Sequence, residues 1–171
     1  MLESVDNLIL GGGMAYTFIK ARGGKIGRSL HEDEYLETTE EIRAKAAEKG
    51  VKLYFIATEV FSEDAPSKIF AADQIEDGWE AMDIWMETRK YFADVIKDSK
   101  TVLWNGPMGV FEMDKYAQGS VAIAEAMAEA TAKGAFTLVG GGDSVAAVNK
   151  YGFADKVSYV STGGGAMLES L

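Results

Sequence analysis

The chain has 171 residues, of which 47% are hydrophobic and 26% charged, a balance typical of a globular protein that excludes an intrinsically disordered one. It contains no cysteine, which excludes disulfides and thiolate metal sites and fits a cytoplasmic location. The net charge of −10 argues against non-specific binding to nucleic acid, because that binding depends on Lys and Arg neutralising phosphates.

The apolar runs are all shorter than the roughly 18 residues that a membrane-spanning helix needs. The first residues, MLESVDN, lack the basic start and the apolar stretch of a secretion signal. We therefore expect neither membrane association nor a leader sequence. A small anionic ligand stays compatible with the acidic composition, because backbone N–H groups bind phosphate without basic side chains.

Short apolar segments without clean alternation are typical of strands that are buried on both faces. The sequence contains five of them, at residues 7–10, 52–57, 101–104, 136–139 and 157–160. Helical patterns lie between these segments, at residues 14–21, 33–50, 79–98 and 120–134. Alternating strands and helices predict βαβ units and a parallel sheet, so the fold class is a doubly wound α/β sandwich in a single domain over 1–171.

The second helical pattern, at residues 33–50, has its acids early, its Lys and Arg late and a glycine stop at Gly50. The last pattern, at residues 120–134, is Ala-rich and also ends in a glycine, Gly134. Residues 58–78 follow no period, and we expect them to form one long irregular stretch.

Glycine is concentrated where the predicted strands end. Triplets at residues 11–13, 140–142 and 163–165 follow the first, fourth and fifth strands, and Gly106 and Gly109 follow the third. The carboxyl ends of parallel strands share one edge of a sheet, where open α/β sheets bind their ligands. Glycine lets the backbone approach an anion closely, and a following helix offers free N–H groups. The pattern predicts a nucleotide- or phosphate-sized ligand at this edge.

Asp143 follows the second triplet directly and is a candidate ligand for Mg²⁺ held against phosphates, with a helix-capping role as the alternative. The only histidine, His31, is better explained as a solvated turn residue than as a catalytic group. Neither common phosphate-binding fingerprint, G-x-x-x-x-G-K-[ST] or G-x-G-x-x-G, is present in the expected context. From these residues alone, the identity of the ligand stays open.

Four longer motifs narrow the choice: LILGGGMAYTF at 8–18, VLWNGPMGVFE at 102–112, GGGDSVAAV at 140–148 and VSTGGGAMLE at 160–169. Together with DAPSK at 64–68 and EDGWEAMDI at 76–84, they resemble the C-terminal, nucleotide-binding domain of phosphoglycerate kinase, in the order of that family. The resemblance implies reversible phosphoryl transfer between 1,3-bisphosphoglycerate and ADP, with Mg²⁺. Such a reaction depends on positioning and charge stabilisation.

The resemblance also implies roles for individual residues. Gly12 and Gly13 are expected to line the adenine pocket, Glu112 to accept hydrogen bonds from the ribose, and Asp143 to bind the metal ion that accompanies ADP or ATP. Met108, Val110 and Phe111 are expected to form an apolar lip of the cleft. The other residues expected at the nucleotide are Asn105, Pro107, Gly141, Gly142 and Ser144. Gly163, Gly164 and Gly165 are expected to stabilise the transferring phosphoryl group.

The sequence departs from the family pattern in several places. The family's N-terminal substrate domain and its strand with a GGAK-type loop are not in this sequence, nor is a final C-terminal segment. The family's D-[IV]-G-P loop is replaced by Asp83-Ile84-Trp85-Met86, which we interpret as an apolar helical stretch, and Tyr159 stands where histidine is usual. Pairing of the first strand with the third would replace the lost central strand, giving the flavodoxin-like order 2-1-3-4-5.

These departures favour a truncated or engineered chain that binds ADP or ATP weakly and does not turn over alone. Two alternatives stay open: a scaffold whose glycine turns bind nothing, and one part of a split enzyme that the missing N-terminal domain complements. Self-association through exposed apolar surface is a further expectation.

Overall fold

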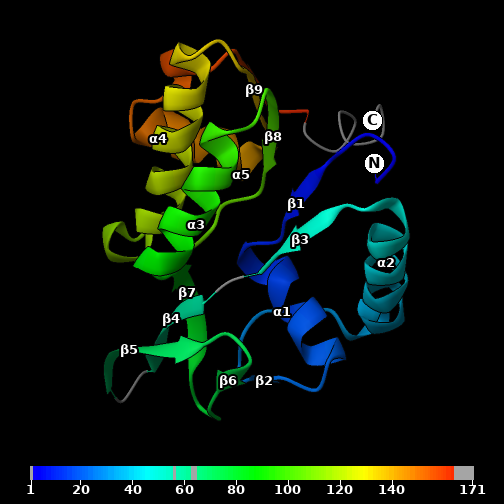
Figure 1. Cartoon of the computed structure of the whole chain (residues 1–171). Coiled ribbons are helices and arrows are strands. Elements are labelled where there is room, and N and C mark those ends of the chain that lie inside the picture. Colours follow the sequence, from blue (N-terminus) through cyan, green and yellow to red (C-terminus); the bar gives the residue numbers. More distant parts are fainter. Residues whose placement is uncertain (1, 56, 63–64, 164–171) are drawn as a thin grey trace. The chain divides into compact units, whose positions relative to one another are not determined.

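The computed structural model describes residues 2–55, 57–62 and 65–163 (Figure 1). Its residues cluster into two compact units, Met1–Trp85 and Met86–Leu171. Strands and helices occur in both units, which agrees with the predicted α/β class. Among the described residues, no helix has both the length and the apolar character to cross a bilayer.

The first unit begins with a parallel crossover. Strand β1 (Asn7–Ile9) pairs with β3 (Lys52–Tyr54), so that Asn7 lies opposite Lys52. Between them run α1 (Gly12–Ala21), the short helix η1 (Asp33–Tyr35) and α2 (Leu36–Lys49). The core-facing side chains of α1 and α2 include Ala15, Phe18 and Ala46, all buried. Of the predicted neighbours at residues 7–10 and 52–57, Asn7–Ile9 and Lys52–Tyr54 therefore do lie side by side.

Helix α2 ends where the sequence predicts. Gly50 has φ +72, a left-handed conformation that favours glycine. The amide of Val51 then donates to the carbonyl of Ala46 at 2.8 Å, which satisfies a carbonyl that the helix leaves without an internal partner.

This unit also contains an antiparallel sheet, which the sequence did not predict. Strands β4 (Ala57–Ser62), β5 (Ala65–Ala71) and β7 (Glu80–Ile84) form a sheet in the order β5-β4-β7. Two short parallel strands, β2 (Lys25–Ile26) and β6 (Gln74–Ile75), pair separately. The prediction of an irregular stretch over 58–78 is therefore wrong, because most of it is ordered as strands.

The predicted helix at 79–98 is also wrong at its start. Residues Glu80–Ile84 form β7, whose backbone pairs with β4, and helix α3 begins only at Met86. The helical period of the apolar residues is thus overridden by a tertiary strand partner. Asp83 and Ile84 are consequently not the helical stretch that we expected; they are the buried end of a strand.

The second unit contains a three-stranded parallel sheet in the order β10-β9-β8. Helices α3, α4 and α5 gather beside strands β8 and β9 within this unit (Figure 1). Its elements are α3 (Met86–Lys97), β8 (Thr101–Asn105), η2 (Asp114–Tyr116), α4 (Gln118–Ala132), β9 (Phe136–Gly140), α5 (Gly142–Lys150), η3 (Ala154–Lys156) and β10 (Tyr159–Ser161). Helices α3 and α4 pack on each other, and Phe92 of α3 and Met127 of α4 are fully buried.

The strand order agrees with the prediction only within each unit. The third, fourth and fifth predicted strands are neighbours in sequence order, as expected. The predicted single sheet of five strands, in the order 2-1-3-4-5, is not confirmed: β1 and β3 form one sheet, and β8, β9 and β10 form another. The need to pair exposed backbone groups does not by itself determine which strand becomes the partner.

Candidate functional site

The turn after β8 is held by its own tryptophan. Trp104 is buried, and its indole Nε1 donates a hydrogen bond of 2.6 Å to the carbonyl of Gly106. Gly106 has φ +98, so a residue with a side chain would be strained there. Asn105 ends the strand with an exposed side chain. The predicted ligand residue Asn105 therefore lies at the open edge of the sheet.

The turn after β9 touches the turn after β8. Asn105 lies opposite Gly140 in the strand register, and a Cβ atom at Gly141 would meet the Asn105 side-chain oxygen Oδ1. Gly141 has φ +86, so both its backbone conformation and its surroundings favour glycine. The fully buried Ser144 accepts a hydrogen bond of 2.6 Å from the Gly106 amide through its Oγ. The structure thus brings Asn105, Gly141 and Ser144 together.

Asp143 stands in the first turn of α5, next to this junction. It is exposed, as is Gly142, and the N-cap residue of the helix makes no side-chain capping hydrogen bond. Helix N-termini favour anions because their free N–H groups carry partial positive charge. Among the described residues, no group of three or more His, Cys, Asp or Glu side chains could hold a metal ion by itself. An ion here would need further oxygen ligands from elsewhere.

The loop after Gly106 is only partly an apolar lip. Pro107, Met108 and Val110 are half-buried, and the Met108 amide donates to Ser120 Oγ at 3.0 Å. Phe111 is buried and belongs to a core cluster with Ala117 and Ala147, against which Tyr151 packs. The expectation that Phe111 lines a cleft is therefore wrong, because this side chain fills the core of its own unit.

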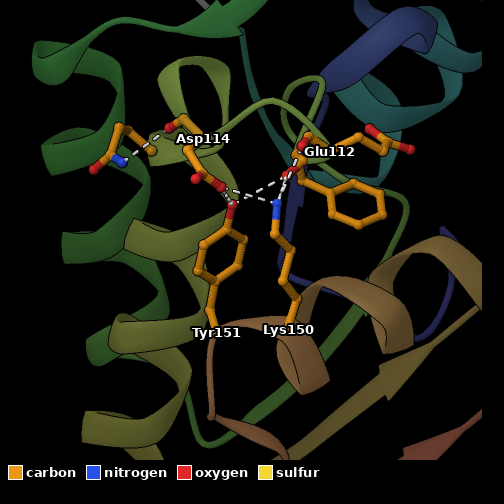
Figure 2. A network of polar contacts seen from close by, with 6 residues as sticks. Glu112, Asp114, Lys150 and Tyr151 are labelled. Carbon is orange, nitrogen blue, oxygen red and sulfur yellow. Dashed lines mark hydrogen bonds and ion pairs between the residues drawn. The ribbon is translucent and has the colours of Figure 1, made fainter.

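A polar network fixes the end of the same loop (Figure 2). Lys150 Nζ donates to the carbonyl oxygens of Phe111 and Glu112, at 3.0 and 3.1 Å, and to Asp114 Oδ1 at 2.9 Å. The Tyr151 hydroxyl lies 3.0 Å from the Phe111 carbonyl oxygen and 3.1 Å from Asp114 Oδ1. Hydrogen bonds from Lys150 and then from Tyr151 lower the pKa of Asp114, and the bond to Asp114 raises the pKa of Lys150.

Sequence reasoning did not single out Lys150 or Tyr151. Both follow the GGGDSVAAV motif, at the end of a helix that the period analysis did not identify. A lysine in the last turn of a helix is usually explained by the helix dipole alone. No local pattern singles them out, because their partners lie 36 or more positions earlier in the sequence.

The first unit contains the other predicted nucleotide residues. Gly12 has φ +59 at the start of α1, and a Cβ atom at Gly13 would lie 2.8 Å from Leu30 Cδ2. Leu30 is 71% exposed, an unusual state for leucine, and sequence reasoning passed over it. Its signal was an apolar residue inside the polar stretch GRSLHEDE.

Of the last glycine triplet, only Gly163 falls within the described residues. It is exposed, and its amide donates to Ser161 Oγ at 3.2 Å. Gly164 and Gly165, for which we expect a role in stabilising the transferring group, lie outside the described residues.

His31 belongs to a separate polar cluster in the first unit. Its Nδ1 lies 2.8 Å from the Ser29 carbonyl oxygen and its Nε2 lies 2.8 Å from Lys20 Nζ. Lys20 also bonds Asp33 at 2.6 Å, which lowers the pKa of that carboxyl. His31 is half-buried and directly precedes Glu32, the N-cap of η1, so of the two non-catalytic interpretations, solvated turn residue and neighbour of a helix cap, the second describes it better.

Comparisons with known proteins agree on one family. The family model described as phosphoglycerate kinase matches residues 1–171. The phosphoglycerate kinase of Porphyromonas gingivalis is 57% identical over 175 residues, which include all of this chain and 42% of that protein. That of Rippkaea orientalis is 54% identical over 176 residues and is covered to 44%.

Solved structures give the same result. The structure of phosphoglycerate kinase from Coxiella burnetii matches 98% of this chain with a TM-score of 0.90 and 42% identity, and 44% of that chain is covered. The enzyme from Pyrococcus horikoshii matches 96% with a TM-score of 0.77 and 28% identity. The chain thus spans less than half the length of the relatives it matches. The family model matches the whole sequence, which also contains the glycine-rich turns described above. The chain therefore belongs to the phosphoglycerate kinase family.

Proposed function

We propose that this chain is the nucleotide-binding portion of a phosphoglycerate kinase, corresponding to the C-terminal domain of that family. The reaction of the whole protein is phosphoryl transfer between 1,3-bisphosphoglycerate and ADP in the cytoplasm. The observation that carries the proposal is the junction of the turns after β8 and β9, where Gly106 is hydrogen-bonded to Ser144. This junction gathers two of the predicted ligand-binding turns at one edge of a parallel sheet.

The phosphate end of the nucleotide is assigned to the start of α5. The exposed backbone of Gly142 and the helix N-terminus suit an anion, and Gly141 leaves room for its approach. Asp143 offers a carboxylate, a ligand type that Mg²⁺ prefers. Mg²⁺ in kinases is commonly held by one or two carboxylates together with the substrate phosphates. Asp143 therefore fits an ion that arrives with the nucleotide, and the ion supplies charge neutralisation of the phosphates.

The nucleoside end is assigned, within the second unit, to Asn105, Pro107, Val110 and Glu112. For Gly12 and Gly13 of the first unit, the family resemblance implies a role at the adenine. Within the first unit, Leu30 is a large exposed apolar side chain beside Gly13, which is the kind of contact that a planar base requires. Glu112 is exposed, and its carboxylate can accept hydrogen bonds from ribose hydroxyls.

By itself the chain is proposed to bind ADP or ATP weakly and not to turn over. The groups that hold phosphoglycerate belong to an N-terminal domain that this sequence does not include. The expected role of Gly163, Gly164 and Gly165 in stabilising the transferring group requires that domain. Complementation by the separate domain, or self-association of this chain, would then govern its behaviour in solution.

Titration with Mg-ADP tests the proposal. The chain is heated with increasing Mg-ADP up to millimolar concentrations, and unfolding is followed by circular dichroism. A retained site raises the melting temperature progressively with ligand. The variant Asp143→Asn should weaken Mg-ADP about tenfold, the scale of one lost charge-assisted contact, while leaving metal-free ADP in EDTA unchanged.

Asp155→Asn is the matched control, because Asp155 is an exposed acid of the same unit in η3. Absence of any shift in the unaltered chain at millimolar Mg-ADP would contradict nucleotide binding and leave the scaffold interpretation. A coupled kinase assay with and without the separately supplied N-terminal domain tests complementation: phosphoryl transfer only in the mixture identifies a part of a split enzyme.

A further inference from the structure

Helix α5 holds the segment after β8 at two places. In its first turn, Ser144 accepts a hydrogen bond from the Gly106 amide. At its last residue, Lys150 bonds the carbonyl oxygens of Phe111 and Glu112. Lys150 follows Ser144 by six positions, which corresponds to about 9 Å along a helix. One rigid element therefore determines where both ends of this segment lie.

All three N–H donors of Lys150 are used on three residues of the segment Phe111–Asp114. An ammonium group has three N–H bonds, and its three acceptors are the Phe111 carbonyl, the Glu112 carbonyl and Asp114 Oδ1, at 3.0, 3.1 and 2.9 Å. The phenol of Tyr151 adds a further donor against the Phe111 carbonyl and Asp114. Lysine on the surface is ordinarily solvated and mobile; here its charge and geometry are both committed to this segment.

The other side of the segment is fixed by apolar packing. Phe111 is 7% exposed and lies in the core cluster with Ala117 and Ala147. Phe111 is thus held by the packing of its side chain in the core cluster and by the hydrogen bond from Lys150 to its carbonyl oxygen. Glu112, the next residue, has no freedom to move its backbone without breaking one of these contacts.

The charges leave Glu112 available to a ligand. Asp114 is the carboxylate that neutralises Lys150. The Glu112 carbonyl points to Lys150 Nζ, whereas its carboxylate extends away from Lys150, Tyr151 and Asp114 (Figure 2). Its backbone is therefore fixed while its carboxylate faces away from the cation that fixes it.

We infer that Lys150 and Tyr151 are positioning residues that hold Glu112 for the ribose hydroxyls of the bound nucleotide. The inference rests on the proposed function and adds to it two residues that contact no ligand themselves. It predicts a selective effect: loss of the network weakens the contact to the ribose and leaves the contacts to base and phosphates in place.

A comparison of two nucleotides isolates that effect. Affinity of the 171-residue chain is measured by calorimetric titration with ADP and with 2′,3′-dideoxy-ADP, which keeps base and diphosphate but lacks both ribose hydroxyls. The unaltered chain should prefer ADP about tenfold, the value of a charge-assisted hydrogen bond. Lys150→Met, which keeps the apolar stem, and the milder Tyr151→Phe should reduce this preference to about twofold or less, with dideoxy-ADP affinity unchanged.

Lys156→Met is the matched control. Lys150 Nζ lies 5.0 Å from the ring centroid of Tyr151, and Lys156 Nζ similarly lies 4.8 Å from that of Phe153. The Lys156 variant should keep the full preference. A purely structural role for Lys150 would weaken both nucleotides equally or neither, which overturns the inference. The inference is likewise overturned, with the proposed function intact, if the unaltered chain binds ADP and dideoxy-ADP equally well. If it binds no ADP at all, the proposed function fails and the inference with it.

Discussion

The amide of Gly106 donates a hydrogen bond of 2.6 Å to the Oγ of Ser144, across 38 positions of the sequence. Ser144 is fully buried, whereas Asn105 and Asp143, the residues just before each partner, are exposed. A partly buried bond thus fixes the distance between two turns that both present polar side chains outward. The stability of this junction and the geometry of the candidate site are therefore linked.

Replacement of Ser144 should destabilise the fold. Ser144→Ala leaves the Gly106 amide without its acceptor and should lower the free energy of unfolding by about 1–2 kcal/mol. Urea denaturation measures this as a lower midpoint with an unchanged slope. Asn149→Ala, at an exposed position of the same helix, should stay within about 0.5 kcal/mol of the unaltered chain. Equal losses in both variants would show that the Gly106 bond has no special weight.

Gly141 and Gly134 form a natural pair for a second test. Both have positive φ, but a Cβ atom at Gly134 meets nothing within 4 Å, whereas one at Gly141 meets the Asn105 oxygen. Gly134→Ala should cost about 1–2 kcal/mol from the left-handed backbone alone. Gly141→Ala should cost about 1 kcal/mol more, because Asn105 must leave its rotamer. The added change Asn105→Ala should remove that excess; its persistence would contradict the steric explanation.

The Asp114 network gives the stability a pH dependence. Bonds from Lys150 and Tyr151 lower the pKa of Asp114 in the folded state. A lowered folded-state pKa adds stability above the pKa of the unfolded chain, and that stability is lost as pH falls through the folded value. The unaltered chain should therefore lose more stability than Asp114→Asn between about pH 5 and pH 3. Denaturation at each pH measures this, and parallel curves for the two proteins would argue against it.

The packing of α3 on α4 should dominate the stability of the second unit. Phe92 is fully buried, and Phe92→Ala should cost about 3–5 kcal/mol through lost burial and a cavity. Met86, on the same helix, is 54% exposed, and Met86→Ala should change stability by less than about 1 kcal/mol. Thermal or urea unfolding distinguishes the two. A small loss of stability in Phe92→Ala would contradict this prediction and would mean that the neighbouring side chains repack into the space that Phe92 leaves.

The parallel parts of the fold were predictable because their signals are local. The strands β8 and β9 begin at Thr101 and Phe136, where the sequence predicts, and Gly50 ends α2 as expected. The antiparallel part was not predictable from periodicity. The residue pattern of β7 favours the start of a helix. It forms a strand because it pairs with β4, which lies about 20 residues earlier in the sequence. Pro66 also argues against a strand, yet β5 is an edge strand, where proline is tolerated.

The residues of the candidate site also divide into those that local sequence patterns predict and those that depend on distant contacts. The glycine triplets at strand ends pointed to Gly141, because its position follows from the strand before it. Asn105 was expected only from the family resemblance of its motif. Phe111 was misassigned because an apolar residue in a loop is equally compatible with a ligand and with a core, and only the packing on Ala147 decides between them. Lys150 and Tyr151 were missed because their contacts reach back 36 or more positions, to Asp114 and beyond. No local pattern encodes such a contact.

The indole of Trp104 is buried and bonded to the Gly106 carbonyl, at the turn that Ser144 secures. Its excited state therefore senses the polarity and hydrogen bonding of that turn. The chain has two further tryptophans, Trp79 and Trp85, and phenylalanine at both positions would leave Trp104 as its single tryptophan. Emission wavelength and quenching of that fluorophore would then report the state of the turn directly, without a foreign label. The indole of Trp104, whose hydrogen bond closes the turn after β8, is therefore also an intrinsic fluorescent probe of that turn.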